Sequence, residues 1–522
     1  MAETSAPGKN ERQEPNTNEG SVRETLESII IAFVLAFMFR AFIVEAFVIP
    51  TGSMAPTLLG AHFRAECPMC GYQFTLNAAD QSRTSADVDC TMCDYEISLG
   101  AKPTLQESGD RILVLKYVYE FAEPQRWQVV VFKNPKDPEQ NYIKRLVGLP
   151  EEELWLVGGN VFTRPLNADG TATGNADAWR IQRKPYEVQQ AVWVPVYHSR
   201  YYPLDDGDPS VSGPIETYSP RSRAWHVPWQ PTERTEQAWS FEQRGPHWRH
   251  EGDEAGVLAF EFADKHLLNY YNYNALRNGP APLSDDPIED MRVGATFVPE
   301  DTGLTVTMRT GSQRRQFRGT LDAEGNAKLE MRPVVMDPQE DAGPWETVAQ
   351  VEGRPLEAGQ GTRVELWHAD QRLSMWRDGD LLAEWTYEEE ASALAERSFE
   401  IIQPAVDITV AGPAVTLHKV NLDRDLYHTS AEKMGALGTS DPITIAADNF
   451  YCLGDNSPAS EDSRLWDAVD PWLLNMTDVP VGFVPREMMI GRAFYVYFPA
   501  MWRFREGGAA VIPNFADMRF IR

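Results

Sequence analysis

The chain has 522 residues, 43% of them hydrophobic, so it is long enough for two or three domains with cores of their own. Its 77 acidic and 48 basic residues give a net charge of −29 at pH 7, which argues against a nucleic-acid partner because phosphate binding needs a basic surface. We expect the acidic surface to serve solubility. Residues 1–25 are rich in Glu, Asn, Gly, Ser and Pro, and we expect them to form a disordered tail.

An apolar run follows this tail, and we expect a transmembrane helix over residues 26–48. The run from Ser28 to Val48 is long enough for one helical crossing of a bilayer, which needs roughly 20 mostly apolar residues. Its one basic residue, Arg40, could pair with Glu45. A buried core helix and a cleaved signal peptide are the alternatives, although no small-residue cleavage site follows the run.

Four of the five cysteines form two CxxC pairs, Cys67 with Cys70 and Cys90 with Cys93, separated by residues 71–89. This spacing predicts a zinc-ribbon-like unit over residues 66–95, because two such knuckles supply four thiolates to one tetrahedral zinc ion. Disulfides or free thiols are the alternatives if the unit lies outside the cytoplasm. The fifth, Cys452, is expected to be a small buried apolar side chain.

A lysine occupies a predicted strand in the next part of the chain. Trp127 to Phe132 has the pattern of a short strand, and the apolar pattern resumes from Tyr142 to Leu149 after a turn, so Lys144 falls within a strand. A lone lysine there usually lies on a solvated face. A buried lysine, however, has a lowered pKa and can act as the base for a serine nucleophile such as Ser53, which follows the apolar run.

Residues 161–445 separate this region from the last part of the chain, and we expect a large insertion there with a β-sandwich at about 235–425. Short strand patterns recur with turns between them, and Asp378-Gly379 is a typical two-residue hairpin turn. The expected strands are Val257–Phe262, Leu304–Met308, Phe317–Leu321, Ala327–Met331, Arg363–Trp367, Leu373–Trp376, Leu381–Trp385 and Ile408–Val410.

The segment from Thr362 to Trp385 resembles the jelly-roll sandwiches of the concanavalin or laminin-G type. Such folds bind sugars, bind proteins or bind nothing, so a carbohydrate ligand, a protein ligand and a spacer without a ligand all stay open. We expect Trp367, Trp376 and Trp385 to lie in the core of the sandwich and not on a binding surface.

Five stretches resemble the type I signal peptidases, the membrane-bound Ser/Lys proteases that remove signal peptides from exported proteins. They occur in the order of that family, after an apolar helix: Phe47–Leu58 (FVIPTGSMAPTL), Gly109–Tyr117 (GDRILVLKY), Val129–Pro150 with VVVFKNP and YIKRLVGLP, Gly454–Trp466 (GDNSPASEDSRLW) and Gly482–Pro499 (GFVPREMMIGRAFYVYFP). The resemblance implies a first core segment at 49–160, a second at 446–505 and a C-terminal tail at 506–522.

The resemblance also implies roles for single residues. Ser53 matches the nucleophile, Lys144 the general base, Ser460 the serine that orients this lysine, and Thr51 a hydroxyl residue that joins the Ser53 N–H in an oxyanion hole. The residues that match apolar pockets for the substrate are Phe47, Ile49, Pro50, Tyr142 and Ile143. Charge pairs among Arg145, Asp455, Asp462 and Arg464 are expected to hold the loop of Ser460.

The sequence therefore predicts a mainly β protein with an N-terminal transmembrane helix, a signal-peptidase-type catalytic core, a zinc-ribbon-like insertion and a β-sandwich insertion. The resemblance implies a single-pass protein of the inner membrane, with its catalytic domain outside the cytoplasm, that cleaves preproteins. It implies no cofactor for catalysis, and a zinc ion would be structural. The alternatives are a self-cleaving Ser/Lys repressor-type protease and a membrane-tethered binding protein that displays the sandwich on an inactive core.

Overall fold

The computed structural model describes most of the chain. The residues described are 17–78, 87–93, 95–98, 106–167, 169–173, 178–203, 227–242, 247–252, 254–262, 272–274, 288–335, 342–396, 405–428, 436–476, 480–499, 502–503, 510–512 and 514–522.

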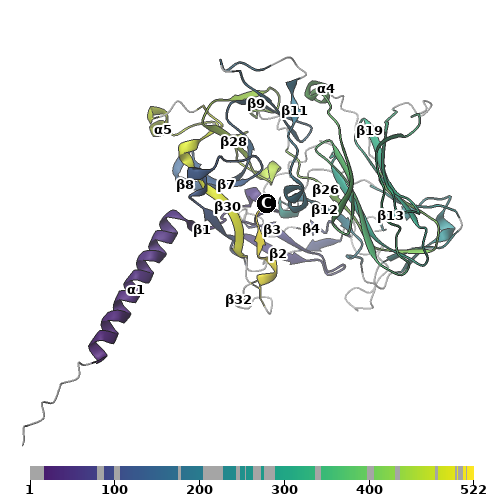
Figure 1. Cartoon of the computed structure of the whole chain (residues 1–522), viewed down its shortest axis with the longest axis horizontal. Helices are drawn as coiled ribbons and strands as arrows, with labels where there is room; N and C mark the ends of the chain where they lie inside the picture. The colour runs from purple at the N-terminus through teal and green to yellow at the C-terminus, as the bar shows by residue number, and fades with distance from the viewer. Residues whose placement is uncertain are drawn as a thin grey trace, which may run out of the picture.

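The first element is a long helix, α1 (Thr17–Phe42), which projects from the rest of the folded chain (Figure 1). Residues 17–25, predicted to be part of the tail, form its first turns, and the rest of that tail lies outside the described residues. The predicted span over 26–48 is wrong at its end, because residues Val44–Val48 form strand β1, which pairs with another strand of the core. Within the described part of the chain, no helix has the length and apolarity needed to cross a membrane.

An antiparallel sheet of eight strands carries the residues predicted to be catalytic, and we call it the core sheet. Its path runs β1, β6, β30, β7, β8, β28, β29, with β33 paired to β30. The bounds of its other strands are β6 (Arg111–Leu115), β7 (Val129–Asn134), β8 (Asp137–Gly148), β28 (Asn449–Leu453), β29 (Val484–Pro485), β30 (Met489–Phe498) and β33 (Arg519–Phe520). Strands from both ends of the chain thus form one sheet, and the segment at 506–522, predicted as a tail, returns to it through β33.

A smaller sheet packs beside the core sheet in the order β11, β10, β9, β27. Its strands are β9 (Glu152–Val157), β10 (Asn160–Pro165), β11 (Arg180–Ile181) and β27 (Ile443–Ile445). Short helices lie in the connections: α2 (Val118–Phe121), α3 (Tyr186–Val192), α4 (Ala391–Ala395) and α5 (Pro471–Met476). The two short strands β31 (Trp502–Arg503) and β32 (Ala510–Ile512) pair with each other.

Two further antiparallel sheets enclose a large apolar core and form the predicted sandwich, on the right in Figure 1. One holds β12 (Val194–His198), β14 (Trp239–Glu242), β15 (His247–His250), β17 (Met291–Pro299), β22 (Thr362–Ala369), β23 (Arg372–Arg377), β24 (Asp380–Thr386) and β26 (Val415–Arg424). The other holds β13 (Trp229–Pro231), β16 (Gly256–Phe260), β18 (Thr305–Gly311), β19 (Arg315–Leu321), β20 (Ala327–Pro333), β21 (Glu346–Val351) and β25 (Asp407–Ala411).

All eight strands expected in this region are present within a few residues of their predicted ends. The hairpin at Asp378-Gly379 is confirmed, because both residues have positive φ, 51° and 90°, as a two-residue type I′ turn requires. The sandwich begins before residue 235, however, since β12 and β13 belong to it. Their sequences contain Pro195 and Pro231, which weaken a strand pattern.

The two CxxC pairs lie at the tips of two hairpins. The first is β2 (His62–Glu66) with β3 (Gln73–Asn77), and the second is β4 (Asp87–Asp89) with β5 (Glu96–Ser98). Each pair closes its turn in the same way, because Cys67 N–H donates to the carbonyl of Tyr72 and Cys90 N–H donates to that of Tyr95.

A buried lysine joins the sandwich to the rest of the chain. Lys184 Nζ lies 2.6 Å from Asp370 and 2.9 Å from Asp425, both of which the sandwich region contributes, and all three side chains are at most 4% exposed. The Lys184 ammonium also lies 5.3 Å from the ring centre of Trp127. Since Trp127 immediately precedes β7, this cluster ties the sandwich to the core sheet.

Candidate active site

Ser53 lies in a short 3₁₀ turn, η1 (Gly52–Met54), that follows β1. Ala55 N–H closes this turn on the carbonyl of Gly52, and Met54 and Leu58 are fully buried on its inner side. The Ser53 side chain is half-buried. The turn therefore fixes Ser53 at the edge of the core without covering it.

Lys144 lies on β8 and reaches the serine from the neighbouring part of the sheet. Its Nζ is 2.7 Å from Ser53 Oγ, and its side chain is almost completely buried. This burial lowers the pKa of Lys144 to about 8, because desolvation disfavours the ammonium form, and the nearby Asp462 carboxylate only partly offsets the effect. The structure thus joins the two residues in the geometry that a nucleophile and its base require.

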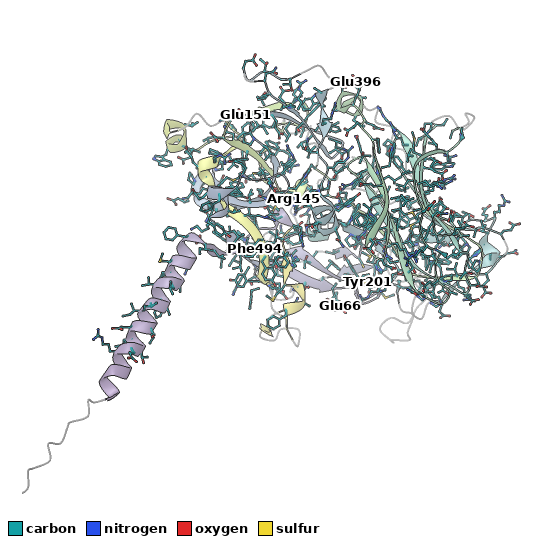
Figure 2. The ribbon with its side chains drawn as sticks, viewed as in Figure 1. Glu66, Arg145, Glu151, Tyr201, Glu396 and Phe494 are labelled. Atoms are coloured by element: carbon teal, nitrogen blue, oxygen red, sulfur yellow. The ribbon has the colours of Figure 1, made fainter. Side chains whose placement is uncertain are left out.

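The charge pairs expected around the site are confirmed. Arg145, next to Lys144 on β8, binds Asp455 through two hydrogen bonds of 2.7 and 2.6 Å, and both side chains are fully buried. Asp462 and Arg464 form a second buried pair, with Nη2 2.7 Å from the carboxylate. Figure 2 shows Arg145 in the interior of the core region. These two pairs fix the loop after β28 against β8.

The residues predicted to assist the pair lie nearby, without the predicted contacts. Ser460 is buried, and its Oγ makes no hydrogen bond with any described residue. A Cβ on Gly454 would fall 2.1 Å from Ser460 Oγ and 2.5 Å from the carbonyl oxygen of Ser53, so glycine there lets the Ser460 loop close onto the Ser53 loop. Thr51 is exposed in extended backbone directly before η1. The roles of Ser460 and Thr51 stay predictions.

The predicted substrate-binding residues divide between two faces. Phe47, Ile49 and Ile143 belong to one apolar cluster with Met54, beside the serine. Tyr142 points to the opposite face of β8 from Ile143, as alternation along a strand requires, and Lys144 Nζ lies 5.3 Å from its ring centre. Pro50 is exposed between β1 and η1. The binding role of this set also stays a prediction.

Asn456 is a site residue that sequence reasoning missed. Its side-chain amide donates to the carbonyl of Gly52 at 2.9 Å, and its backbone N–H donates to the carbonyl of Ser53 at 3.0 Å. The residue is fully buried. Its position next to Asp455, in the stretch that resembles the protease family, was the one signal that could have identified it.

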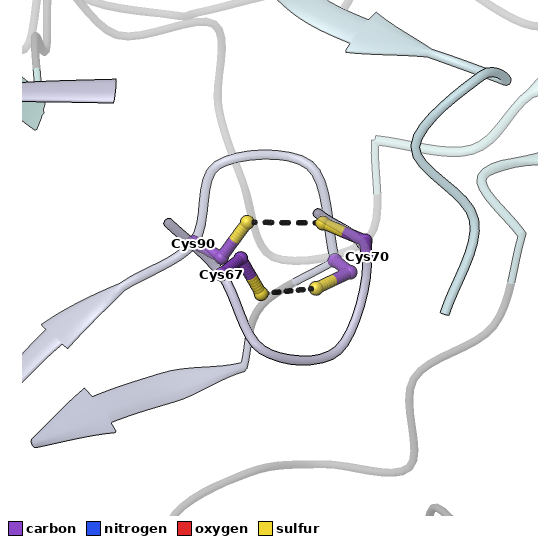
Figure 3. A group of neighbouring side chains, drawn as sticks. Cys67, Cys70 and Cys90 are labelled. Atoms are coloured by element: carbon purple, nitrogen blue, oxygen red, sulfur yellow. Dashed lines mark hydrogen bonds between the residues drawn. The ribbon is translucent and has the colours of Figure 1, made fainter. Parts of the chain in front are cut away.

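The four cysteines of the hairpin tips form a compact cluster (Figure 3). All are buried, their sulfur atoms lie within 4.8 Å of one another, and Cys67 lies 3.5 Å from Cys93 and Cys70 3.6 Å from Cys90. Zn–S bonds of about 2.3 Å in a tetrahedron place sulfur atoms about 3.8 Å apart, so the cluster has the dimensions of a zinc site. The cluster also packs against Tyr201, which is labelled in Figure 2. Cys452, in contrast, is buried in the apolar core as predicted.

The remaining predictions for single side chains concern the sandwich. Trp367 and Trp376 are 4% and 9% exposed and stack with ring centres 4.5 Å apart, while Trp385 packs against the sandwich core. The expectation that they lie in the core of the sandwich is therefore wrong for Trp367 and Trp376, which form a separate buried cluster with Trp193.

The site is thus a serine held against a buried lysine on a β scaffold, an arrangement in which the lysine can act as the base for the serine. Residues 92–187 and 401–498 match the family described as signal peptidase, peptidase S26. These segments include Lys144, Asn456 and Ser460, whereas Ser53 precedes the first of them.

Curated relatives agree with this match. Signal peptidase I of Pseudomonas fluorescens is 34% identical over 128 residues, which cover 20% of this chain and 43% of the relative. Signal peptidase I of Rickettsia canadensis is 28% identical over 159 residues, covering 30% and 49%. The chain thus spans just under half the length of each of these relatives. Two segments of the chain are therefore similar to the signal peptidase family.

The sandwich has solved structural neighbours of low similarity. A carbohydrate binding module from Bacillus subtilis aligns with 9% identity and a TM-score of 0.21, covering 35% of this chain and 90% of the module. A galectin from Caenorhabditis elegans aligns with 10% identity and a TM-score of 0.18, covering 26% and 82%.

Burial of Lys144 should make stability depend on pH. Because the folded-state pKa of about 8 lies below the ordinary value of 10.5, the unfolded chain holds the proton over a range in which the folded chain has lost it. The free energy of unfolding should therefore rise from pH 8 to 10.5, by about 3 kcal/mol in total, and this gain should be lost as pH falls through 8.

The Lys144→Met variant isolates this effect from other titrating groups. Methionine keeps much of the volume and has no charge to bury, so the variant should be more stable than the unsubstituted protein below pH 8, with the difference shrinking toward pH 10.5. Urea unfolding of both proteins at several pH values measures this difference in the free energy of unfolding. A difference that stays constant with pH would contradict the lowered pKa.

Proposed function

We propose that this protein is a signal peptidase, an endopeptidase that removes N-terminal signal peptides from exported preproteins. The observation that carries the proposal is the 2.7 Å contact between Ser53 Oγ and the buried Nζ of Lys144. The match of two segments to the signal peptidase family supports the same reaction and substrate class.

The chemistry follows from the two side chains. Neutral Lys144 takes the proton of Ser53 Oγ as this oxygen attacks the scissile carbonyl, and the protonated lysine then gives a proton to the leaving amine. Water hydrolyses the resulting acyl-enzyme with Lys144 again as base. The Ser53 N–H and the Thr51 hydroxyl stabilise the oxyanion, and Ser460 orients the lysine. The apolar cluster of Phe47, Ile49 and Ile143 takes the small residues before the cleaved bond, Pro50 lies beside it, and Tyr142 contributes from the other face of β8, next to Lys144.

Cleavage of a preprotein by the detergent-purified protein tests the proposal. Ser53→Ala and Lys144→Ala should each abolish cleavage, and the double variant should lose no more than either one, because the two residues act as a unit. The cleavage rate of the unsubstituted protein should rise with pH through about 8 as Lys144 loses its proton.

A surface variant provides the control. Lys136→Ala removes a lysine from the same hairpin, but its ammonium is exposed and bound to Asp467, so cleavage should be unchanged. Undiminished cleavage by Ser53→Ala would show that the site is not the protease. A protein without any cleavage activity would favour the membrane-tethered binding protein.

Helix α1 is the part of the chain that we assign to a lipid bilayer. Its apolar side chains are 46–67% exposed, and they occur at consecutive positions, so they cover every side of the helix. The exposed set is Leu26, Ile29, Ile30, Ile31, Phe33, Val34, Leu35, Phe37, Met38 and Phe42. A surface of this kind is stable only when it is covered, and a bilayer covers it from all sides.

Flotation with lipid vesicles tests this assignment. The full chain should float with vesicles of neutral phospholipid, and Ile30→Asp together with Phe33→Asp and Phe37→Asp should leave it at the bottom of the gradient, because buried carboxylates are costly in lipid. The triple variant should still cleave a soluble peptide substrate. A full chain that stays soluble and monomeric without lipid or detergent would refute the assignment.

The four-cysteine cluster holds a structural zinc ion in this proposal. Burial of all four sulfur atoms and their spacing support it. Neither Ser53 nor Lys144 contacts the cluster, so zinc would stabilise the two hairpins and take no part in the reaction. The carbohydrate or protein ligand considered for the sandwich stays a prediction.

Elemental analysis of the purified protein should find one zinc per chain. Cys67→Ser with Cys93→Ser should abolish zinc binding and expose residues 62–98 to protease, because small zinc units depend on the metal for their fold. Cys452→Ser, the matched control, should keep the metal. Protein without zinc, whose cysteines react with thiol reagents only after reduction, would show that disulfides form instead.

A further inference from the structure

Among the described residues, the 3₁₀ turn η5 (Asn272–Asn274) of the sandwich insertion lies against the Ser53 loop. Tyr273 and Asn274 are both 4% exposed. The ring of Tyr273 packs directly on Gly52, where a Cβ would fall 2.1 Å from a ring carbon, and it also contacts Ala55. The insertion therefore lies against the backbone on both sides of Ser53.

Asn274 forms a reciprocal amide pair with Asn456. Asn274 Nδ2 donates to Asn456 Oδ1 at 2.8 Å, and Asn456 Nδ2 donates to Asn274 Oδ1 at 2.9 Å. The second proton of Asn456 Nδ2 goes to the carbonyl of Gly52 at 2.9 Å. The carbonyl of Gly52 can only accept, so Asn456 Nδ2 must face it, and Asn274 holds the Asn456 amide in this orientation through the two reciprocal hydrogen bonds.

This contact sets the direction of the Ser53 N–H. The carbonyl of Gly52 and the N–H of Ser53 belong to one planar trans peptide unit, so they point in opposite directions. A hydrogen bond that holds the Gly52 carbonyl toward Asn456 therefore holds the Ser53 N–H away from it. The backbone N–H of Asn456 fixes the next carbonyl, that of Ser53.

We propose that Asn274, supplied by the sandwich insertion, is a positioning residue for the oxyanion hole of Ser53. It acts through Asn456 and the Gly52–Ser53 peptide, and it touches neither the substrate nor the reacting atoms. The inference rests on the proposed peptidase function, because it assigns a role within the same site. It gives the insertion a part in catalysis.

The Asn274→Ala variant tests the role. Without its partner, the Asn456 amide can rotate, and the Gly52–Ser53 peptide loses its fixed direction. Removal of an oxyanion donor costs ~10²–10³-fold in kcat, so misdirection of one should cost ~10- to 100-fold, with KM changed less than about threefold. Asn274→Leu, which keeps the volume and lacks the hydrogen bonds, should show the same loss and provides the test if the alanine variant does not fold.

A peptide boronic acid separates positioning from a general loss of structure. Its tetrahedral adduct on Ser53 uses the oxyanion hole, so its affinity for Asn274→Ala should fall by the same factor as kcat, while binding of uncleaved peptide stays unchanged. Asn326→Ala is the matched control. It removes an insertion amide whose hydrogen-bond partners among the described residues, Asp322 and the N–H of Gly353, lie outside the site, and it should keep kcat and boronate affinity.

The Asn456→Ala background completes the test. Since Asn274 acts through Asn456, Asn274→Ala should lower kcat by less than about twofold when Asn456 is already alanine. Unchanged kcat in Asn274→Ala, or an equal loss in both backgrounds, would overturn the inference. The Ser53→Ala variant in the same assay separates the two claims. If Ser53→Ala is still active, the peptidase proposal is wrong. If Ser53→Ala is inactive but Asn274→Ala is fully active, only the positioning role is wrong.

Discussion

The site depends on the buried ion pair between Arg145 and Asp455. Arg145 extends from β8, the strand that carries Lys144. Asp455 begins the loop that carries Asn456 and Ser460. The bidentate contact between Arg145 and Asp455 therefore sets the distance between this strand and this loop. Arg145 also donates to the carbonyls of Trp127 and Arg522, and Thr57 of the Ser53 segment donates to Asp455. Two desolvated charges are costly unless their remaining groups are also paired, and here the neighbouring backbone provides those partners.

Much of this arrangement could be predicted from the sequence. Alternating apolar residues predicted the strand of Lys144 and the strands of the sandwich, because alternation follows directly from a pleated strand with one buried face. The turn at Asp378-Gly379 was predictable because few residues accept positive φ. The pairing of Ser53 with Lys144 came from the resemblance of their surroundings to a family, and the structure brings the two residues together.

Other features depend on contacts between distant residues, which a local pattern does not contain. The end of α1 at Phe42 is one case, because the apolar residues after it read equally well as helix or strand, and only pairing with β6 decides between them. Asn274 is another, since a single asparagine in an irregular segment carries no signal until the fold places it beside Asn456. The tertiary partner, and not local propensity, decides both.

The buried Lys184 has a consequence for how the chain can be divided. Lys184 precedes the first strand of the sandwich, β12, whereas both carboxylates that neutralise its ammonium directly follow strands of the sandwich, Asp370 after β22 and Asp425 after β26. A shortened chain without the sandwich would keep an uncompensated charge in a closed interior, and an isolated sandwich would keep two. Each part therefore neutralises buried charge of the other, so the two should unfold together in one cooperative transition. Loss of either part would require a compensating change at Lys184.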